Sequence, residues 1–254
     1  MVTGAARGIG AATARGLAAE DWLVVAVDRA ADDPRLPYAM GSAAELEALA
    51  AGDARITTAV ADAADPEALG RIVEDAERRH GGVDAIVAAA GVVAGGVPLW
   101  EMAIEQQDAV LEVDLGGVLA AARAGIPALL RRPEPRAGRF IAVASTAATR
   151  GLPQLAAYCA AKAGVVGFVR ALAVELGGTG VTANTVSPGS TRTAILDESA
   201  RLYNLESAEA FAAQQPLGRL IEPEEVAAVI AFLASPQSRA VTGADYAVDG
   251  GLSL

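Results

Sequence analysis

The sequence predicts a single α/β domain over residues 1–254, built on a doubly wound parallel sheet flanked by helices. Apolar, β-branched runs recur along the chain, helical patterns fill most intervals between them, and no repeat or low-complexity linker divides it. This alternation is typical of a parallel sheet covered on both faces. Strands are expected at Trp22–Val27, Ile56–Val60, Ala85–Ala90, Phe140–Ala144, Val181–Val186 and Ala244–Val248.

Helical segments are expected between these strands. Asp65 and Pro66 provide a cap and a first-turn proline, and a glycine pair follows the basic last turn at residue 80, which predicts a helix between Pro66 and Gly81. A second helix is expected over Pro223–Ser235. Two longer alanine-rich stretches, Met102–Leu130 and Leu155–Leu176, also have helical patterns.

Composition excludes several classes of protein. The net charge of −11 and pI near 4.6 leave no basic surface for a nucleic acid. Cys159 is the single cysteine and there is one histidine, so neither an intramolecular disulfide nor a metal site is expected. The longest uncharged run, Ala85–Trp100, is shorter than the ~20 residues of a membrane helix. With no signal sequence visible, we expect a cytoplasmic protein without membrane contacts.

A glycine-rich turn at the start of the chain is the first motif with chemical meaning. Gly4, Gly8 and Gly10 open a helix and precede a strand that ends at Asp28. Glycines allow backbone amides to approach a pyrophosphate, and a carboxylate about twenty residues later can hold a ribose and repel a 2′-phosphate. This predicts NAD. A plain turn and a solvated strand end are the alternatives, and Arg7 or Arg29 could instead bind a phosphate.

A second motif combines Tyr158 and Lys162, which share one face of a predicted helix, with Ser145 at the end of the preceding strand. An ammonium group near a tyrosine lowers the pKa of the phenol, as a general acid or base near neutral pH requires. A surface helix would explain most chance matches to this spacing.

The order and spacing of these motifs resemble the short-chain dehydrogenase/reductase family over nearly the whole chain. The resemblance implies a Rossmann-like fold, NAD as cofactor, a homotetramer, and hydride transfer between an alcohol and a carbonyl. It makes Ser145, Tyr158 and Lys162 the catalytic set. It implies these cofactor contacts: Gly4, Arg7, Gly8, Ile9, Gly10, Asp28, Arg29, Asp62, Ala63, Ala89, Ala90, Gly91, Tyr158, Lys162, Pro188, Gly189, Thr191 and Thr193.

Three features depart from the family pattern. Asp114 stands where the family places a catalytic asparagine that supports a proton relay to the lysine, so Asp114 joins the candidate catalytic residues and the pH behaviour of the relay is in question. Ala88 and Ala89 replace two asparagines of a strand. The first strand is reduced to Met1 and Val2, which suggests a chain that begins earlier.

Two irregular segments are expected to carry specificity. Ser190–Leu217 follows a predicted strand and is a candidate substrate lid. Arg29–Gly41, within a wider insertion over 29–54, lies near the adenosine end. With Ala94–Trp100, Gly151–Pro153 and Ala156–Lys162, it resembles the mycofactocin-associated branch of the family. That resemblance implies tightly held NAD that a redox peptide reoxidises, and an ordinary surface insertion is the alternative.

Two other functions compete with a dehydrogenase of small alcohols and carbonyls. Asp114 and the short first strand favour a nucleotide-sensing protein that has lost catalysis. A sugar-nucleotide epimerase or dehydratase could use the same tyrosine and lysine, but the chain is short for one and its glycine spacing differs.

Overall fold

The computed structural model describes all 254 residues and contains a seven-stranded sheet in the order β3-β2-β1-β4-β5-β6-β7. All strand pairs are parallel. The predicted doubly wound α/β fold is therefore confirmed. The strands are β1 (Val2–Thr3), β2 (Val24–Asp28), β3 (Ile56–Val60), β4 (Ala85–Ala88), β5 (Arg139–Val143), β6 (Thr182–Pro188) and β7 (Asp245–Val248).

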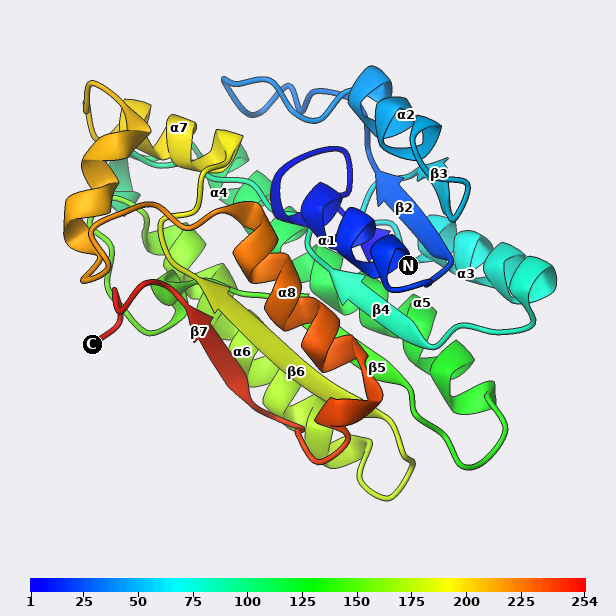
Figure 1. Cartoon of the computed structure of the whole chain (residues 1–254). Coiled ribbons are helices and arrows are strands. Elements are labelled where there is room, and N and C mark those ends of the chain that lie inside the picture. Colours follow the sequence, from blue (N-terminus) through cyan, green and yellow to red (C-terminus); the bar gives the residue numbers. More distant parts are fainter.

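Helices cover both faces of the sheet (Figure 1). One layer contains α1 (Gly8–Ala19), α2 (Ala43–Ala51) and α8 (Pro223–Ala234), and the other contains α3 (Pro66–His80), α4 (Ile104–Leu111), α5 (Gly117–Arg131) and α6 (Ala156–Glu175). Each layer packs against its own hydrophobic cluster. The strand order reverses between β1 and β4, and open α/β sheets bind ligands at the carboxyl ends of the strands at such a point.

The first strand is short but lies in the middle of the sheet. Val2 pairs with Ala26 on β2 and with Val87 on β4. The buried Thr3 hydroxyl accepts hydrogen bonds from the backbone N–H groups of Ala89 and Ala90, at 3.2 and 3.4 Å. Two residues therefore suffice to hold the end of β4 beside the glycine-rich turn.

The capping residues predicted at the two ends of α3 are confirmed. The Asp65 side chain accepts hydrogen bonds from the N–H groups of Glu67 and Ala68, each at 2.9 Å. At the other end Gly81 adopts a left-handed conformation with φ of 77°, which glycine adopts without steric cost.

The expected continuous helix over Met102–Leu130 is interrupted. Between α4 and α5 the chain forms a π-helical turn over Glu112–Gly116, and such turns often occur at functional sites. The combined stretch Ile104–Arg131 and the helix Ala156–Glu175 are long and apolar enough to cross a membrane. Both pack against the sheet with about half of their most apolar window buried, so packing inside this fold accounts for their apolar composition.

Two segments extend beyond the carboxyl ends of the strands (Figure 1). The Arg29–Gly41 segment has no helix or strand, as predicted. The Ser190–Leu217 segment is more regular than predicted: it contains α7 (Ala194–Leu202) and a 3₁₀ helix over Ala208–Gln214. The Thr193 hydroxyl caps α7 by accepting a hydrogen bond from the Leu196 N–H at 3.4 Å, a local cap that sequence analysis missed.

Candidate active site

A cavity of about 760 Å³ opens at the carboxyl ends of the strands. Every residue expected to contact the cofactor lines it, and so does Ser145. Asp114 lies behind the cavity wall and is completely buried. The topology thus brings the sequence motifs together at the cavity. Asp114 is the one candidate residue that does not line it.

The glycine-rich turn is fitted closely to the end of β4. Gly4 has φ of +67°, and a Cβ there would lie 2.6 Å from the Cα of Ala90. A Cβ on Gly10 would lie 2.1 Å from the Gly4 carbonyl oxygen. Neither position can accept a side chain, so the first turn of α1 keeps its free amides and its positive dipole end at the cavity.

Asp28 ends β2 at the same cavity. Its two carboxylate oxygens accept hydrogen bonds from the N–H groups of Ala6 at 3.0 Å and Ala30 at 2.9 Å. A carboxylate has about four acceptor positions, so lone pairs remain for a diol. A Cβ on Gly41 would lie 3.2 Å from Asp28 Oδ1, which places the end of the Arg29–Gly41 segment directly beside this carboxylate.

The two arginines that could have bound a 2′-phosphate have partners within the protein. Arg29 Nη1 donates to Asp33 Oδ2 at 2.9 Å, and its Nε lies 3.8 Å from Asp62 Oδ2. Arg7 Nη2 donates to the Ala39 carbonyl at 2.6 Å. Arg7 therefore holds the 29–41 segment to the glycine-rich turn.

The Arg29–Gly41 segment reaches across the cavity to the opposite helices. The Tyr38 hydroxyl accepts a hydrogen bond from the Val93 N–H at 2.9 Å. Leu36 is buried in a cluster with Val92, Val110 and Ala157. The segment is therefore a packed wall of the cavity and not a loose surface loop.

The candidate catalytic residues converge from β5 and α6. Lys162 Nζ donates to the Val143 carbonyl at the end of β5, at 3.2 Å, and lies 5.6 Å from the centre of the Tyr158 ring. Ser145 follows β5, and its hydroxyl accepts a hydrogen bond from the Ala147 N–H at 3.1 Å. The three side chains line the same part of the cavity.

Asp114 forms a buried ion pair with Lys162, with 3.3 Å between Asp114 Oδ1 and Lys162 Nζ. The same oxygen accepts a hydrogen bond from the Val92 N–H at 3.0 Å, and Oδ2 has no partner. Burial raises the pKa of Asp114, and Lys162 opposes that shift. Burial alone would lower the pKa of Lys162, but Asp114 and Tyr158 together outweigh it and the pKa is raised.

Lys162 acts to lower the pKa of Tyr158, as expected, but it does not set the net direction of the shift. Burial raises the pKa of Tyr158 above its ordinary value, although Lys162 and a hydrogen bond with Ser145 act to lower it. The negative charge of Asp114 adds to the increase. Asp114 thus offsets part of the effect of the lysine.

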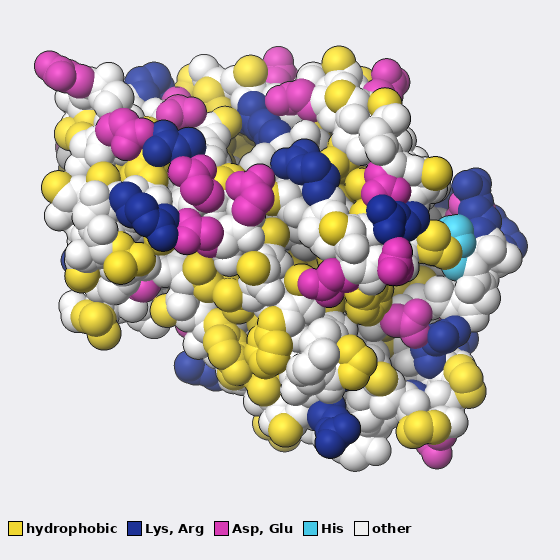
Figure 2. Space-filling model, in the orientation of Figure 1, with side chains coloured by type: hydrophobic (Ala, Val, Ile, Leu, Met, Phe, Trp, Pro, Cys, Tyr) yellow, Lys and Arg dark blue, Asp and Glu magenta, His cyan; other side chains and the backbone are white.

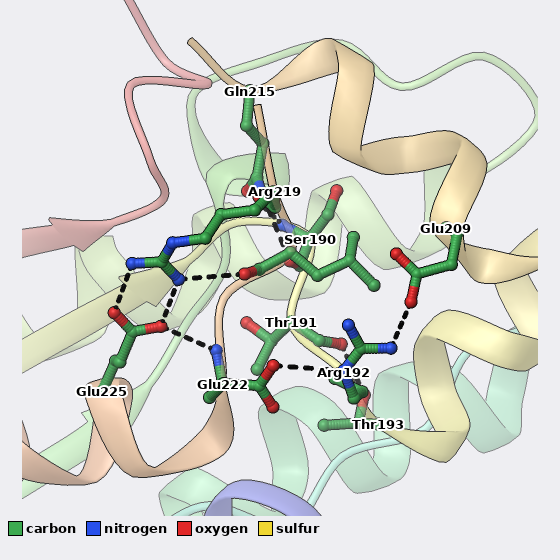
Figure 3. Close-up of polar contacts among 10 residues, drawn as sticks. Ser190, Thr191, Arg192, Thr193, Glu209, Gln215, Arg219, Glu222 and Glu225 are labelled. Atoms are coloured by element: carbon green, nitrogen blue, oxygen red, sulfur yellow. Dashed lines mark hydrogen bonds and ion pairs between the residues drawn. The ribbon is translucent and has the colours of Figure 1, made fainter. Parts of the chain in front are cut away.

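Hydrogen bonds and ion pairs hold both ends of the Ser190–Leu217 segment, the candidate lid (Figure 3). Gln215 is buried, and its Oε1 accepts a hydrogen bond from the Ser190 N–H at 2.9 Å. Its Nε2 donates to the carbonyls of Ser190 at 3.4 Å and Arg219 at 2.5 Å. Nearer the surface, Arg192 pairs with Glu209 and with Glu222, at 3.1 Å for Glu222.

Sequence analysis missed several residues of the cavity. Tyr38, Arg150 and Tyr203 line it. Tyr38 and Tyr203 lie within the two irregular segments expected to carry specificity, but only the folded chain shows that these side chains reach the site. The Trp100 side chain neither lines the cavity nor packs in the core, because it is 85% exposed.

Comparison with known proteins agrees with this geometry. A family model described as enoyl-(acyl carrier protein) reductase matches residues 4–253. The short-chain reductase protein NovJ of Streptomyces niveus is 38% identical over 254 residues, covering 99% of this chain and 92% of its own. The chain therefore belongs to the short-chain dehydrogenase/reductase family.

Two further relatives carry dehydrogenase names. Cis-4-hydroxycyclohexanecarboxylate dehydrogenase of Sinomonas cyclohexanicum is 36% identical, over 99% of this chain and 94% of its own. The crystal structure of carveol dehydrogenase from Mycobacterium avium in complex with NAD superposes with a TM-score of 0.92 at 31% identity, covering 99% of this chain and 95% of that one.

Proposed function

We propose that this chain is an NAD-dependent oxidoreductase that interconverts an alcohol and a carbonyl, with Ser145, Tyr158 and Lys162 as its catalytic set. The observation that carries the proposal is the convergence of these three side chains in the cavity that also contains the glycine-rich turn. Relatives named as a reductase and as dehydrogenases support the same class of reaction.

The residues present fit a dinucleotide, and they favour NAD. Gly4 and Gly10 leave the backbone exposed to a pyrophosphate. The Asp28 carboxylate keeps free lone pairs for ribose hydroxyls and would repel a 2′-phosphate, while Arg29 is neutralised by Asp33 and Asp62. A structural relative was crystallised with NAD. When bound, NAD supplies the nicotinamide that accepts or donates the hydride.

In the oxidation direction, Tyr158 as phenolate removes the proton of the substrate hydroxyl. The Ser145 hydroxyl donates a hydrogen bond to the same oxygen and orients it. Lys162 stabilises the phenolate through its positive charge. The reverse reaction returns the proton from the Tyr158 phenol to the oxygen of the carbonyl.

Replacing Tyr158 by phenylalanine tests the assignment. Tyr158→Phe is expected to abolish turnover of an alcohol panel and to leave NAD binding intact, because it removes the ionisable oxygen and little else. Tyr246→Phe on β7 is the matched control and should retain activity. Residual Tyr158→Phe activity within about tenfold of the parent, or roughly 1.4 kcal/mol of barrier, would exclude Tyr158 as the general acid and base.

We further propose that NAD is held tightly and reoxidised in place by a redox peptide, as in the mycofactocin-associated branch. The support is the Arg29–Gly41 wall, which contacts the glycine-rich turn through Arg7 and the opposite side of the cavity through Tyr38. Contacts that must break before release slow dissociation more than they speed association. A cofactor that does not exchange requires a second electron carrier.

Nucleotide release tests this second proposal. Purified protein should contain NAD after denaturation, should turn over poorly with added NAD alone, and should cycle when a dye acceptor is supplied. A variant with Asp32–Met40 shortened should exchange NAD faster. Empty protein that cycles freely on added NAD would instead place the chain among family members with an exchangeable cofactor.

The Asp114–Lys162 ion pair favours one alternative, a nucleotide-sensing protein with impaired catalysis. In this pair Asp114 offsets part of the positive charge of Lys162 that would otherwise stabilise the Tyr158 phenolate. Stoichiometric NAD binding, with no turnover of any alcohol at any pH with NAD or with the dye, would support this function over the dehydrogenase.

A further inference from the structure

Arg150 is a cation of the cavity that neither the catalytic set nor the cofactor site uses. Four basic side chains line the cavity. Lys162 pairs with Asp114, Arg29 pairs with acidic residues, and Arg7 is hydrogen-bonded to Ala39 at the adenosine end. Arg150 forms no ion pair. Its Nη1 donates to the carbonyl of Leu252, which also lines the cavity.

Arg150 lies close to Ser145 along the chain. Both residues belong to the loop between β5 and α6, and the Arg150 N–H donates to the Thr146 carbonyl at 2.9 Å. The turn from Thr146 to Arg150 therefore keeps Arg150 in the same short loop as Ser145, and both side chains line the cavity.

The surroundings of Arg150 are apolar, and no acidic side chain lies among them. Leu152 and Pro153 follow Arg150 in the loop, Leu252 accepts its hydrogen bond, and the Tyr203 hydroxyl donates to the Pro153 carbonyl; all four residues line the cavity. The acidic residues that line the cavity, Asp28, Asp33 and Asp62, are all at the adenosine end. A guanidinium with free N–H groups beside an apolar wall is suited to an anionic group on an apolar body.

We propose that Arg150 binds a carboxylate of the substrate, so that the alcohol oxidised by this chain is a hydroxy acid with an apolar body. This inference rests on the proposed dehydrogenase function and adds the substrate class to it. Ser145 and Tyr158 hold the reacting oxygen at one end of the substrate, and Arg150 binds the carboxylate at the other end.

The test compares hydroxycyclohexanecarboxylates, with the hydroxyl at ring position 2, 3 or 4, with the matching neutral carboxamides. The parent should oxidise at least one acid with kcat/KM tenfold or more above that of its amide. Raising the salt concentration should reduce the preference, because exposed charges are screened. Arg150→Gln should abolish the preference while turnover of the amides stays within about threefold, and Arg150→Lys should retain part of it.

Controls separate the proposed role of Arg150 from the proposed dehydrogenase function. Arg71→Gln removes the same charge from an exposed position of α3 outside the cavity and should leave the preference unchanged. Turnover of acids and amides at equal rates, or an unchanged preference in Arg150→Gln, would overturn the role of Arg150 while the dehydrogenase function stands. Absence of turnover both of these compounds and of the alcohol panel, at any pH and with the dye acceptor, would contradict the dehydrogenase function instead.

A binding measurement tests Arg150 without turnover. In isothermal titration of the NAD-loaded protein, cyclohexanecarboxylate should bind at least tenfold more tightly than cyclohexanecarboxamide, and Arg150→Gln should remove this difference. Equal binding of the two probes to the parent would overturn the proposal whatever the outcome of the activity assays.

Discussion

The buried carboxylate of Asp114 competes with the Tyr158 phenolate for the positive charge of Lys162. Asp114 Oδ1 lies 3.3 Å from Lys162 Nζ, and its charge raises the pKa of Tyr158. An asparagine would keep an oxygen to accept the Val92 N–H hydrogen bond without adding this charge. The residue type at position 114 therefore affects the pH at which the catalytic set works.

Asp114→Asn is expected to keep activity and to shift its pH dependence. Because Asp114 raises the pKa of Tyr158, its removal lowers that pKa, and the phenolate forms at lower pH. The rise of kcat/KM for alcohol oxidation should therefore move to lower pH. Full pH profiles of the parent, of Asp114→Asn and of the exposed control Asp108→Asn would measure the shift. An unchanged profile would place Asp114 outside the proton path.

Sequence reasoning could identify residues whose chemistry depends on local spacing. Gly4, Asp28, Tyr158 and Lys162 belong to short patterns, so the sequence alone could propose them, and the structure places them all at one cavity. Arg150 could not be found in this way. It belongs to no pattern, and its position depends on how the loop after β5 packs against Leu252, two residues before the end of the chain.

At the level of elements, helix α3 and the strand positions were predictable because caps and apolar runs are local features. The π-helical turn at Glu112–Gly116 was not, since the sequence over Met102–Leu130 has a continuous helical pattern. Packing against α6 and the end of β4 is what selects the turn, which places Asp114 beside Lys162. The two helices of the candidate lid, α7 and the 3₁₀ helix over Ala208–Gln214, were missed because they are short.

The buried hydrogen bonds of Gln215 and the exposed ion pairs of Arg192, which hold the candidate lid, should contribute differently to the stability of the protein. Gln215→Ala leaves the buried Ser190 N–H and the part-buried Arg219 carbonyl without their partner and should lower the free energy of unfolding by about 2 to 4 kcal/mol. Arg192→Gln removes exposed ion pairs and should cost less than about 1 kcal/mol. Urea unfolding of both variants at equal protein concentration measures the difference. Equal losses would show that the buried amide does not hold the lid.

At the level of the whole molecule, exposed apolar side chains lie on both helical layers. On one layer Val174 of α6 is 81% exposed. On the opposite layer, Phe232 of α8 is 42% exposed and contacts Tyr246 of β7 edge-on, and Figure 2 shows hydrophobic side chains gathered over α8 and β7. Exposed apolar side chains on opposite layers of a subunit suit an assembly with two kinds of two-fold interface.

We expect a homotetramer with one interface on each layer. Light scattering of the parent at micromolar concentration should give about 102 kDa, four times the 25.5 kDa chain. Val174→Lys or Phe232→Lys places a charge in one interface and leaves the other intact, so each variant should form dimers, and the double variant should form monomers. Leu23→Lys, at an exposed position before β2, is the control and should remain tetrameric. A monomeric parent would refute the assembly, and a tetramer that survives both substitutions would show that its interfaces lie elsewhere.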